Sequence, residues 1–279
     1  MPAVPLHTLR QRLQELSSIF EDVPQFKRGL KRLLDQYADQ SYRPGEAIPL
    51  ARASERLSVP PVVIHEVEAA LNTLALQHPE AALQLANLLW AEGSSLDGYL
   101  AAVLIRAVPV TDETRSSIQD RLTQWVQGIE NSSHLISTLV LATEGMKKAA
   151  WDSWLDLIQG WLFSPSPGAR RVALSAIRNL IQDPNFDNFP FVFDWLTQWL
   201  REHVSPALPQ EVLDLLQVLA ERSPAETTYF SRQLMRSLPP SNARRLIRAV
   251  LPMLPEDYRQ RLQSALRQST PPQKPPPSR

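Results

Sequence analysis

Arginines in two segments of this chain have side chains and spacing suited to binding an anion. They are Arg170, Arg171, Arg178, Arg244, Arg245 and Arg248. A planar guanidinium forms two parallel hydrogen bonds with a phosphate or with a carboxylate. These six residues are therefore candidates for binding a nucleic acid or a macromolecular partner. For Arg171 the alternative is a structural ion pair with Asp156 or Asp183 of a neighbouring repeat, and the formal net charge of zero favours that alternative.

Signatures of the common enzyme classes are missing from the sequence. The 8 glycines form no Walker loop, dinucleotide fingerprint or nucleophile elbow. There is no cysteine, and the histidines are too far apart for a metal site: His7, His65, His78, His134 and His203. We expect no cofactor and no metal ion. An enzyme built on this chain would have to use carboxylates, aromatic rings and arginines.

The composition indicates helices separated by prolines. The chain has 25 prolines and 8 glycines in 279 residues. Prolines between helix-forming blocks end one helix and begin the next, whereas a shortage of glycine disfavours tight hairpins. Alternation of apolar and polar residues never persists for the length of a strand, so we predict no sheet.

A repeat positions the candidate arginines. The segments ARRVALSAIRNL (169–180) and ARRLIRAVLPML (243–254) share their first three residues and lie 74 residues apart, or two units of about 37. Related helices fall at 209–222, 132–143 and 97–108. Partner helices precede the five of them, at 79–91, 113–129, 147–162, 189–203 and 224–237. The sequence predicts an all-α fold, an α-solenoid of HEAT-like helical repeats wound as a right-handed superhelix, with the more apolar second helices lining a concave inner face.

The remaining segments complete the predicted organisation. Residues 1–60 form an N-terminal helical region, with helices at 6–20 and 25–38 and a short one near 50–57. The solenoid covers 61–267, beginning with a helix at 61–77, and the Pro-rich tail 268–279 is expected to be disordered. We see neither a secretory signal nor an apolar run long enough to span a bilayer, so we expect a soluble cytoplasmic protein without a membrane partner.

Three short stretches resemble the DNA alkylation repair family, the AlkD-like glycosylases, which are built from HEAT-like repeats. Leu89-Trp90 followed by GYLAAVLI (98–105) is similar to that family's leucine–tryptophan pair before an Ala-rich helix. The turn Val59-Pro60-Pro61 lies upstream, where the family has a Pro-containing turn. The spacing of Trp161, Ser164, Arg171 and Ala173 resembles the family's tryptophan, polar turn, arginine and alanine. The likeness covers about residues 57 to 182.

The resemblance implies a concave cleft in which tryptophans cradle a damaged nucleotide, an aspartate stabilises developing positive charge and arginines hold phosphates. A nearby anion suits an oxocarbenium-like transition state. Trp125 corresponds to the first tryptophan and Arg171 to the first arginine. The aspartate position corresponds to Ile129, and Glu130 is one residue further, rotated by about 100° along a helix. The family's second tryptophan–arginine pair falls at Gln217 and Ala220, so its catalytic set is not intact.

Two features have a structural interpretation beside the functional one. The tryptophans on the first helices recur at helical spacing, which is typical of packing. They are Trp125, Trp151, Trp154, Trp161, Trp195 and Trp199. Between residues 232 and 267 the chain has eight arginines and only two acidic residues, Glu256 and Asp257. Such an excess of positive charge is typical either of a nucleic-acid contact or of the solvated face of capping repeats.

We therefore expect a non-catalytic, HEAT-like binding or scaffold protein related to the DNA alkylation repair family. Its partner, a protein or duplex DNA, would bind on the concave face. The alternative function is a DNA glycosylase acting on alkylated bases through Trp125, Glu130 and Arg171. A third hypothesis is sequence-independent nucleic-acid binding through the C-terminal arginines.

Overall fold

The computed structural model describes residues 5–38, 59–129, 133–202 and 209–268. Within these ranges the chain forms fourteen α-helices, one short 3₁₀ turn and no strand. The predicted all-α class is confirmed. The predicted short helix near 50–57 and the Pro-rich tail beyond Gln268 lie outside the described residues.

The chain divides into two compact units, Met1–Val172 and Ala173–Arg279. The first unit contains α1 (Leu6–Ser17), α2 (Val23–Tyr37), α3 (Pro61–Gln77), α4 (Pro79–Trp90), α5 (Ser95–Ala107), α6 (Asp112–Gln127), α7 (Ser133–Ala149) and α8 (Trp151–Leu162). The boundary falls within α9 (Pro167–Gln182). The second unit contains α10 (Pro190–Glu202), α11 (Gln210–Arg222), α12 (Pro224–Ser237), α13 (Pro240–Val250), the 3₁₀ turn η3 (Leu251–Met253) and α14 (Glu256–Gln268).

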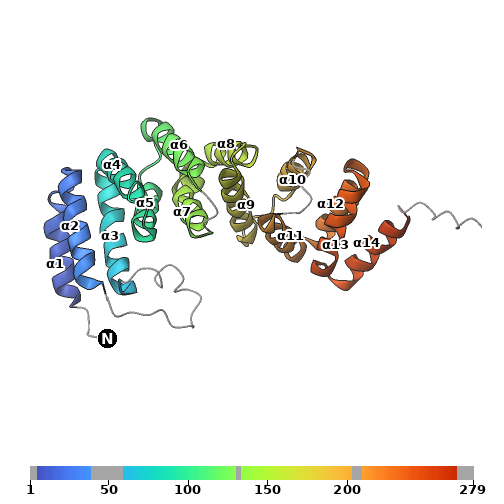
Figure 1. Ribbon diagram of the computed structural model, residues 1–279, viewed down its shortest axis with the longest axis horizontal. Helices are drawn as coiled ribbons and strands as arrows, with labels where there is room; N and C mark the ends of the chain where they lie inside the picture. Colours follow the sequence, from blue (N-terminus) through green and yellow to red (C-terminus); the bar gives the residue numbers. More distant parts are fainter. Residues whose placement is uncertain (1–4, 39–58, 130–132, 203–208, 269–279) are drawn as a thin grey trace, which may run out of the picture. The chain divides into compact units, whose positions relative to one another are not determined.

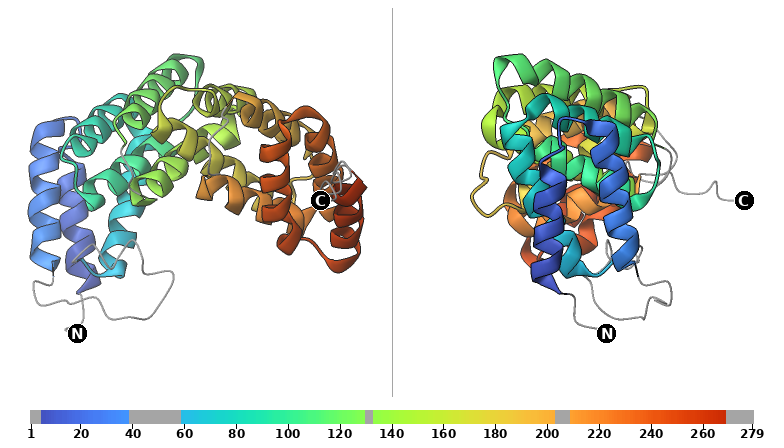
Figure 2. Two further views of the ribbon diagram at one scale, coloured as in Figure 1. Left: turned by 45° about the vertical axis from the view of Figure 1, so that its right-hand side comes forward. Right: turned by 90° about the vertical axis from the view of Figure 1, so that its left-hand side faces the viewer.

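The helices of each unit pack in two rows, consistent with a helical repeat array. In the first unit α1, α3, α5 and α7 follow one another in one row, while α2, α4 and α6 form the other (Figure 1). In the second unit α10, α12 and α14 form one row and α11 packs against α13 in the other (Figure 2). Sequence neighbours such as α3 and α4, or α11 and α12, contact each other across the rows. Pairwise packing along the sequence, which the repeat predicts, is confirmed within each unit.

Prolines and polar caps set the starts of the helices. Six helices begin on a proline: α3, α4, α9, α10, α12 and α13. A proline at the first helical position loses no hydrogen bond, because the N–H there has no partner within the helix. The Asp22 carboxylate accepts from the Gln25 N–H at 3.1 Å and thereby caps α2. The Thr111 and Thr114 hydroxyls form a reciprocal capping box at the start of α6.

Helix α5 is the centre of the first unit. Seven of its residues are buried, because it packs against α3, α4 and α7 together. Backbones approach closely at Gly145 of α7, where an added Cβ would lie 2.2 Å from the carbonyl oxygen of Arg106 in α5. Only glycine fits that position without movement of a neighbouring backbone. The Tyr99 hydroxyl donates to the Glu68 carboxylate and so links α5 to α3, and burial together with this bond raises the pKa of Tyr99.

The structure differs from the sequence prediction mainly at helix ends. Helix α1 ends at Ser17 and α2 already begins at Val23, because Asp22 caps it. The helix expected to continue to residue 254 ends at Val250 and is followed by η3. Pro252 lacks the N–H that a continuing α-helix would use, which accounts for the break. Helix α14 was not predicted as a separate element, although Leu262 is fully buried and anchors it.

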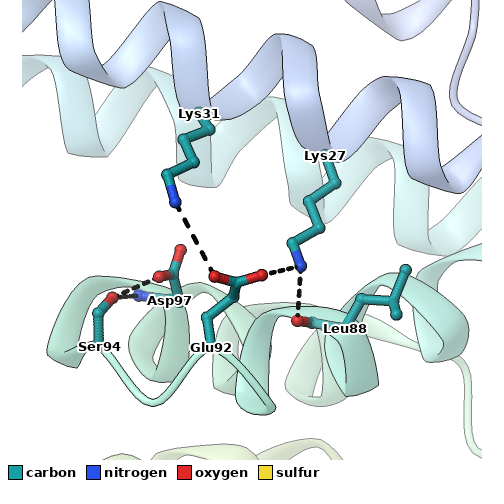
Figure 3. Close-up of polar contacts among 6 residues, drawn as sticks. All are labelled: Lys27, Lys31, Leu88, Glu92, Ser94 and Asp97. Atoms are coloured by element: carbon teal, nitrogen blue, oxygen red, sulfur yellow. Dashed lines mark hydrogen bonds and ion pairs between the residues drawn. The ribbon is translucent and has the colours of Figure 1, made fainter.

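Lysines of α2 hold the end of α4 in place (Figure 3). The Lys27 ammonium donates to the Leu88 carbonyl oxygen at 3.1 Å and to the Glu92 carboxylate, while the Lys31 ammonium lies 3.9 Å from Glu92. The hydrogen bond and charge of Lys27, followed by the charge of Lys31, lower the pKa of Glu92. This contact joins consecutive helices of the second row.

Candidate binding surface

Several cations of this protein bind carbonyl oxygens at the C-terminal end of another helix or in the turn that follows it. The last carbonyls of a helix have no partner within the helix and carry the negative end of its dipole, so a cation is stabilising near them. The residues are Lys27, Arg170, Arg222 and Arg259. Each of them joins its own helix to the end of another one.

Arg170, one of the candidate binding residues, belongs to this set. Its Nη1 donates to the carbonyl oxygens of Ser164 at 2.9 Å and Pro165 at 3.2 Å, just after α8. The side chain is half-buried, as is that of Arg171, the next residue of α9. Arg170 therefore binds the start of the segment SPSPG (164–168), which joins α8 to α9. The predicted pairing of Arg171 with Asp156 or Asp183 stays a prediction.

Arg222 is the most extensively bonded of these cations. It ends α11, and its guanidinium donates to the carbonyl oxygens of Asp183 at 2.9 Å, Ile181 at 3.0 Å and Phe186 at 3.0 Å. It also lies over the Phe189 ring, 5.8 Å from the centroid. One side chain thus binds the turn that follows α9.

Arg178, a second candidate binding residue, also faces another helix. Its Nη1 lies 3.6 Å from an Asp214 carboxylate oxygen of α11. Both side chains are partly exposed, which limits the pair's contribution to stability. Arg178 therefore links α9 to α11 within the second unit.

The structure places Trp125 in the core. It is 4% exposed and stacks on Trp90 of α4, with ring centroids 4.5 Å apart and planes inclined by 6°. Stacking of two indoles in this geometry stabilises the contact between α4 and α6. Glu130, the acidic candidate of the glycosylase hypothesis, lies outside the described residues. Its assignment with Trp125 to a catalytic cleft stays a prediction.

The other tryptophans range from buried to exposed, with Trp195 half-buried. Trp154, Trp161 and Trp199 are almost fully buried, as packing predicts. The Trp161 indole N–H donates weakly to the Thr123 hydroxyl at 3.4 Å and joins α8 to α6. Trp151 is 36% exposed and stacks against Trp154.

The arginines of α13 have a different environment from those of α9. Arg244, Arg245 and Arg248 are all exposed. Within the described residues neither Arg244 nor Arg248 makes an ion pair. They lie one turn apart, on the helix that packs beside α11. Among the candidate binding residues, these two are exposed and make no ion pair within the described ranges.

Charge is unevenly distributed along the second unit. From Asp183 to Glu226 the chain has eight acidic residues and two arginines, a net charge of −6. From Thr227 to Gln268 it has eight arginines and two acidic residues, a net charge of +6. The predicted basic C-terminal segment therefore coincides with α12, α13 and α14. Arg259 differs from the exposed arginines there, because it donates to the carbonyl oxygens of Leu251 and Leu254 at 3.1 and 3.0 Å.

The sequence indicated a basic segment between residues 232 and 267, but not that α12 and α14 form a common surface there. Arg232 of α12 and Arg261 of α14 line one cleft there. The spacing of Tyr258, Leu262 and Leu266 is the signal that could have indicated α14, because these residues share one helical face.

No cluster of three or more histidine, cysteine or acidic side chains that could hold a metal ion occurs in the part of the chain that the structure describes. None of the described helices is long and apolar enough to cross a membrane. No protein family model, curated protein or solved structure matches this chain.

Proposed function

We propose that this protein is a non-catalytic, HEAT-like binding or scaffold protein, and that α13 is part of the surface that binds a macromolecular partner. Arg244 and Arg248 of α13, which are exposed and make no ion pair among the described residues, are the observation that carries this proposal. Arg170 and Arg178 are used within the array, so they have less capacity to bind a phosphate or carboxylate of a partner. Arg244 and Arg248 keep that capacity.

The proposal includes the finer features that the repeat implies. The array would wind as a right-handed superhelix, with α11 and α13 among the second helices that line its concave face. Helix α11 contributes acidic side chains to that row, and α13 contributes arginines. A partner would then meet both signs of charge, which gives specificity and faster association rather than large affinity. A folded protein whose surface carries both positive and negative charges suits this row better than a uniformly negative partner such as duplex DNA.

A charge reversal on α13 tests the proposal. The double variant Arg244→Glu/Arg248→Glu is compared with Arg28→Glu/Arg32→Glu on α2, where the two arginines are also exposed and four residues apart. Both variants and the native protein are immobilised, incubated with an extract of the source cells and analysed by quantitative mass spectrometry. We expect the α13 variant to lose a protein that the native chain and the α2 variant both retain. If all three retain the same proteins, α13 does not bind the partner.

A further inference from the structure

A surface of α12 and α14 combines an exposed aromatic ring with unpaired guanidinium groups. Tyr229 of α12 is 70% exposed. Arg232 and Arg236 follow it by three and seven residues, so the three side chains lie on one face of the helix. Neither arginine makes an ion pair within the described residues. We call these three residues the α12 stripe.

The α12 stripe continues into a cleft between α12 and α14. Arg232, Arg261, Gln260 and Ser264 line this cleft together with Asp257, and its volume is about 550 Å³. The Arg261 guanidinium lies over the Tyr258 ring, 5.4 Å from its centroid, which orients it without neutralising it. The cleft therefore offers two guanidinium groups, with one carboxylate at its wall. The Gln260 amide already donates to Glu256 at 2.9 Å and the Ser264 hydroxyl to the Gln260 carbonyl oxygen at 2.9 Å, so these two side chains offer a ligand their acceptor oxygens. Such a lining suits an anionic ligand that also carries hydrogen-bond donors.

We propose that this surface binds single-stranded nucleic acid. Arginines of the α12 stripe and the cleft would neutralise phosphates, and the ring of Tyr229 would stack on an unpaired base. The Asp257 carboxylate would accept a hydrogen bond from a base amino group. Glu226 lies one turn before Tyr229 and ends the basic surface on that side.

A single strand can contact both the arginines and the ring of Tyr229, whereas other polyanions can contact only the arginines. A duplex keeps its base faces inside the stack, so the ring of Tyr229 would have nothing to stack on. An acidic polypeptide would use the arginines but has no base for the ring. The inference goes beyond the proposed function, because it concerns α12 and α14 rather than the arginines of α13, and either one can fail without the other.

Fluorescence anisotropy with the full-length protein and a labelled thymidine oligonucleotide of about 20 nucleotides tests the inference. Tyr229→Ala removes the ring and Tyr229→Phe keeps it. Arg232→Ala/Arg236→Ala is matched by Arg28→Ala/Arg32→Ala on α2, which has the same spacing and charge change. Circular dichroism checks that each variant is folded, which we expect because these side chains are exposed.

We expect the single strand to bind more tightly than a duplex of the same length. Tyr229→Ala should raise the Kd by roughly 5-fold or more, while Tyr229→Phe stays close to the native value. The double arginine variant on α12 should also reduce the slope of log K against log salt by about 1.4, or about 0.7 for each phosphate that is no longer neutralised. The control variant on α2 should change neither quantity appreciably.

Four results would overturn the inference. The first is the absence of binding at low salt, and the second is duplex binding as tight as single-strand binding. The third is a native Kd in the Tyr229→Ala variant. The fourth is equal displacement of the oligonucleotide by poly-glutamate, at matched charge concentration, from the native protein and from Tyr229→Ala, which would indicate a site for acidic polypeptides.

Discussion

Replacing Arg222 with methionine removes a guanidinium that binds four carbonyl oxygens while keeping an apolar stem of similar length. Three of the bonds are 2.9 to 3.0 Å long, and the fourth, to Pro184, is a weak one of 3.5 Å. A hydrogen bond to a charged group contributes about 1.5–3 kcal/mol, so their sum is an upper limit. Water can reach the freed carbonyls, because Gln182, Pro184 and Asn185 are exposed. We therefore expect the free energy of unfolding to fall by about 2–4 kcal/mol, which corresponds to a decrease in Tm of about 4 °C or more.

Urea unfolding followed by circular dichroism measures the loss, and hydrogen exchange locates it. Amides between residues 181 and 189 should exchange faster in the variant, because Arg222 binds this turn directly. Arg201→Met on α10 is the control, since Arg201 is exposed and makes no ion pair among the described residues. A loss below about 0.5 kcal/mol with unchanged exchange at 181–189 would refute the assignment of Arg222 as the residue that holds this turn.

Three further predictions concern the first unit. Gly145→Ala should destabilise the protein by about 1–3 kcal/mol in urea unfolding, because the new Cβ meets the Arg106 carbonyl oxygen; an unchanged midpoint would contradict the close approach. The pKa of Glu92 in the folded protein lies below its usual value of 4.5. The contribution of Glu92 to stability is therefore fully present above pH 4.5 and is lost as the pH falls through the lowered pKa. Stability should therefore decrease more steeply on acidification in the native protein than in Glu92→Gln, and parallel pH profiles would argue against the Lys27 contact. Trp125→Ala should lower the free energy of unfolding by about 3–5 kcal/mol, as expected for a buried indole, whereas a loss under 1 kcal/mol would indicate an accessible ring.

The helical class and the positions of most helices were predictable from the sequence. Prolines such as Pro79 and Pro224 begin the helices where their missing N–H has no consequence. The repeat also predicted the pairing of neighbouring helices, because apolar positions recur at the same places in each sequence repeat of about 37 residues. The division of the chain within α9 had no signal in composition, since it depends on which helices contact each other in space.

The roles of individual arginines were less predictable than the fold. Arg170 and Arg244 occupy the same position of the repeated ARR motif, yet one binds main-chain carbonyls and the other is exposed. The difference depends on the turn before each helix, because the SPSPG turn brings the Ser164 and Pro165 carbonyls close to Arg170. Spacing along a helix does not report where the carbonyls of the preceding turn lie. For the same reason the contacts of Arg222 could not be predicted, because its partners are about forty residues away in the sequence.

Trp125 and Trp161, which resemble tryptophans of the glycosylase family, are buried and join neighbouring helices of the array. We therefore infer that they stabilise the fold and do not cradle a damaged nucleotide. Release of alkylated bases from methylated duplex DNA by the purified protein tests this inference, and we expect no release above that of a sample without protein. Release above that background, lost in Trp125→Phe while circular dichroism shows an intact fold, would contradict it.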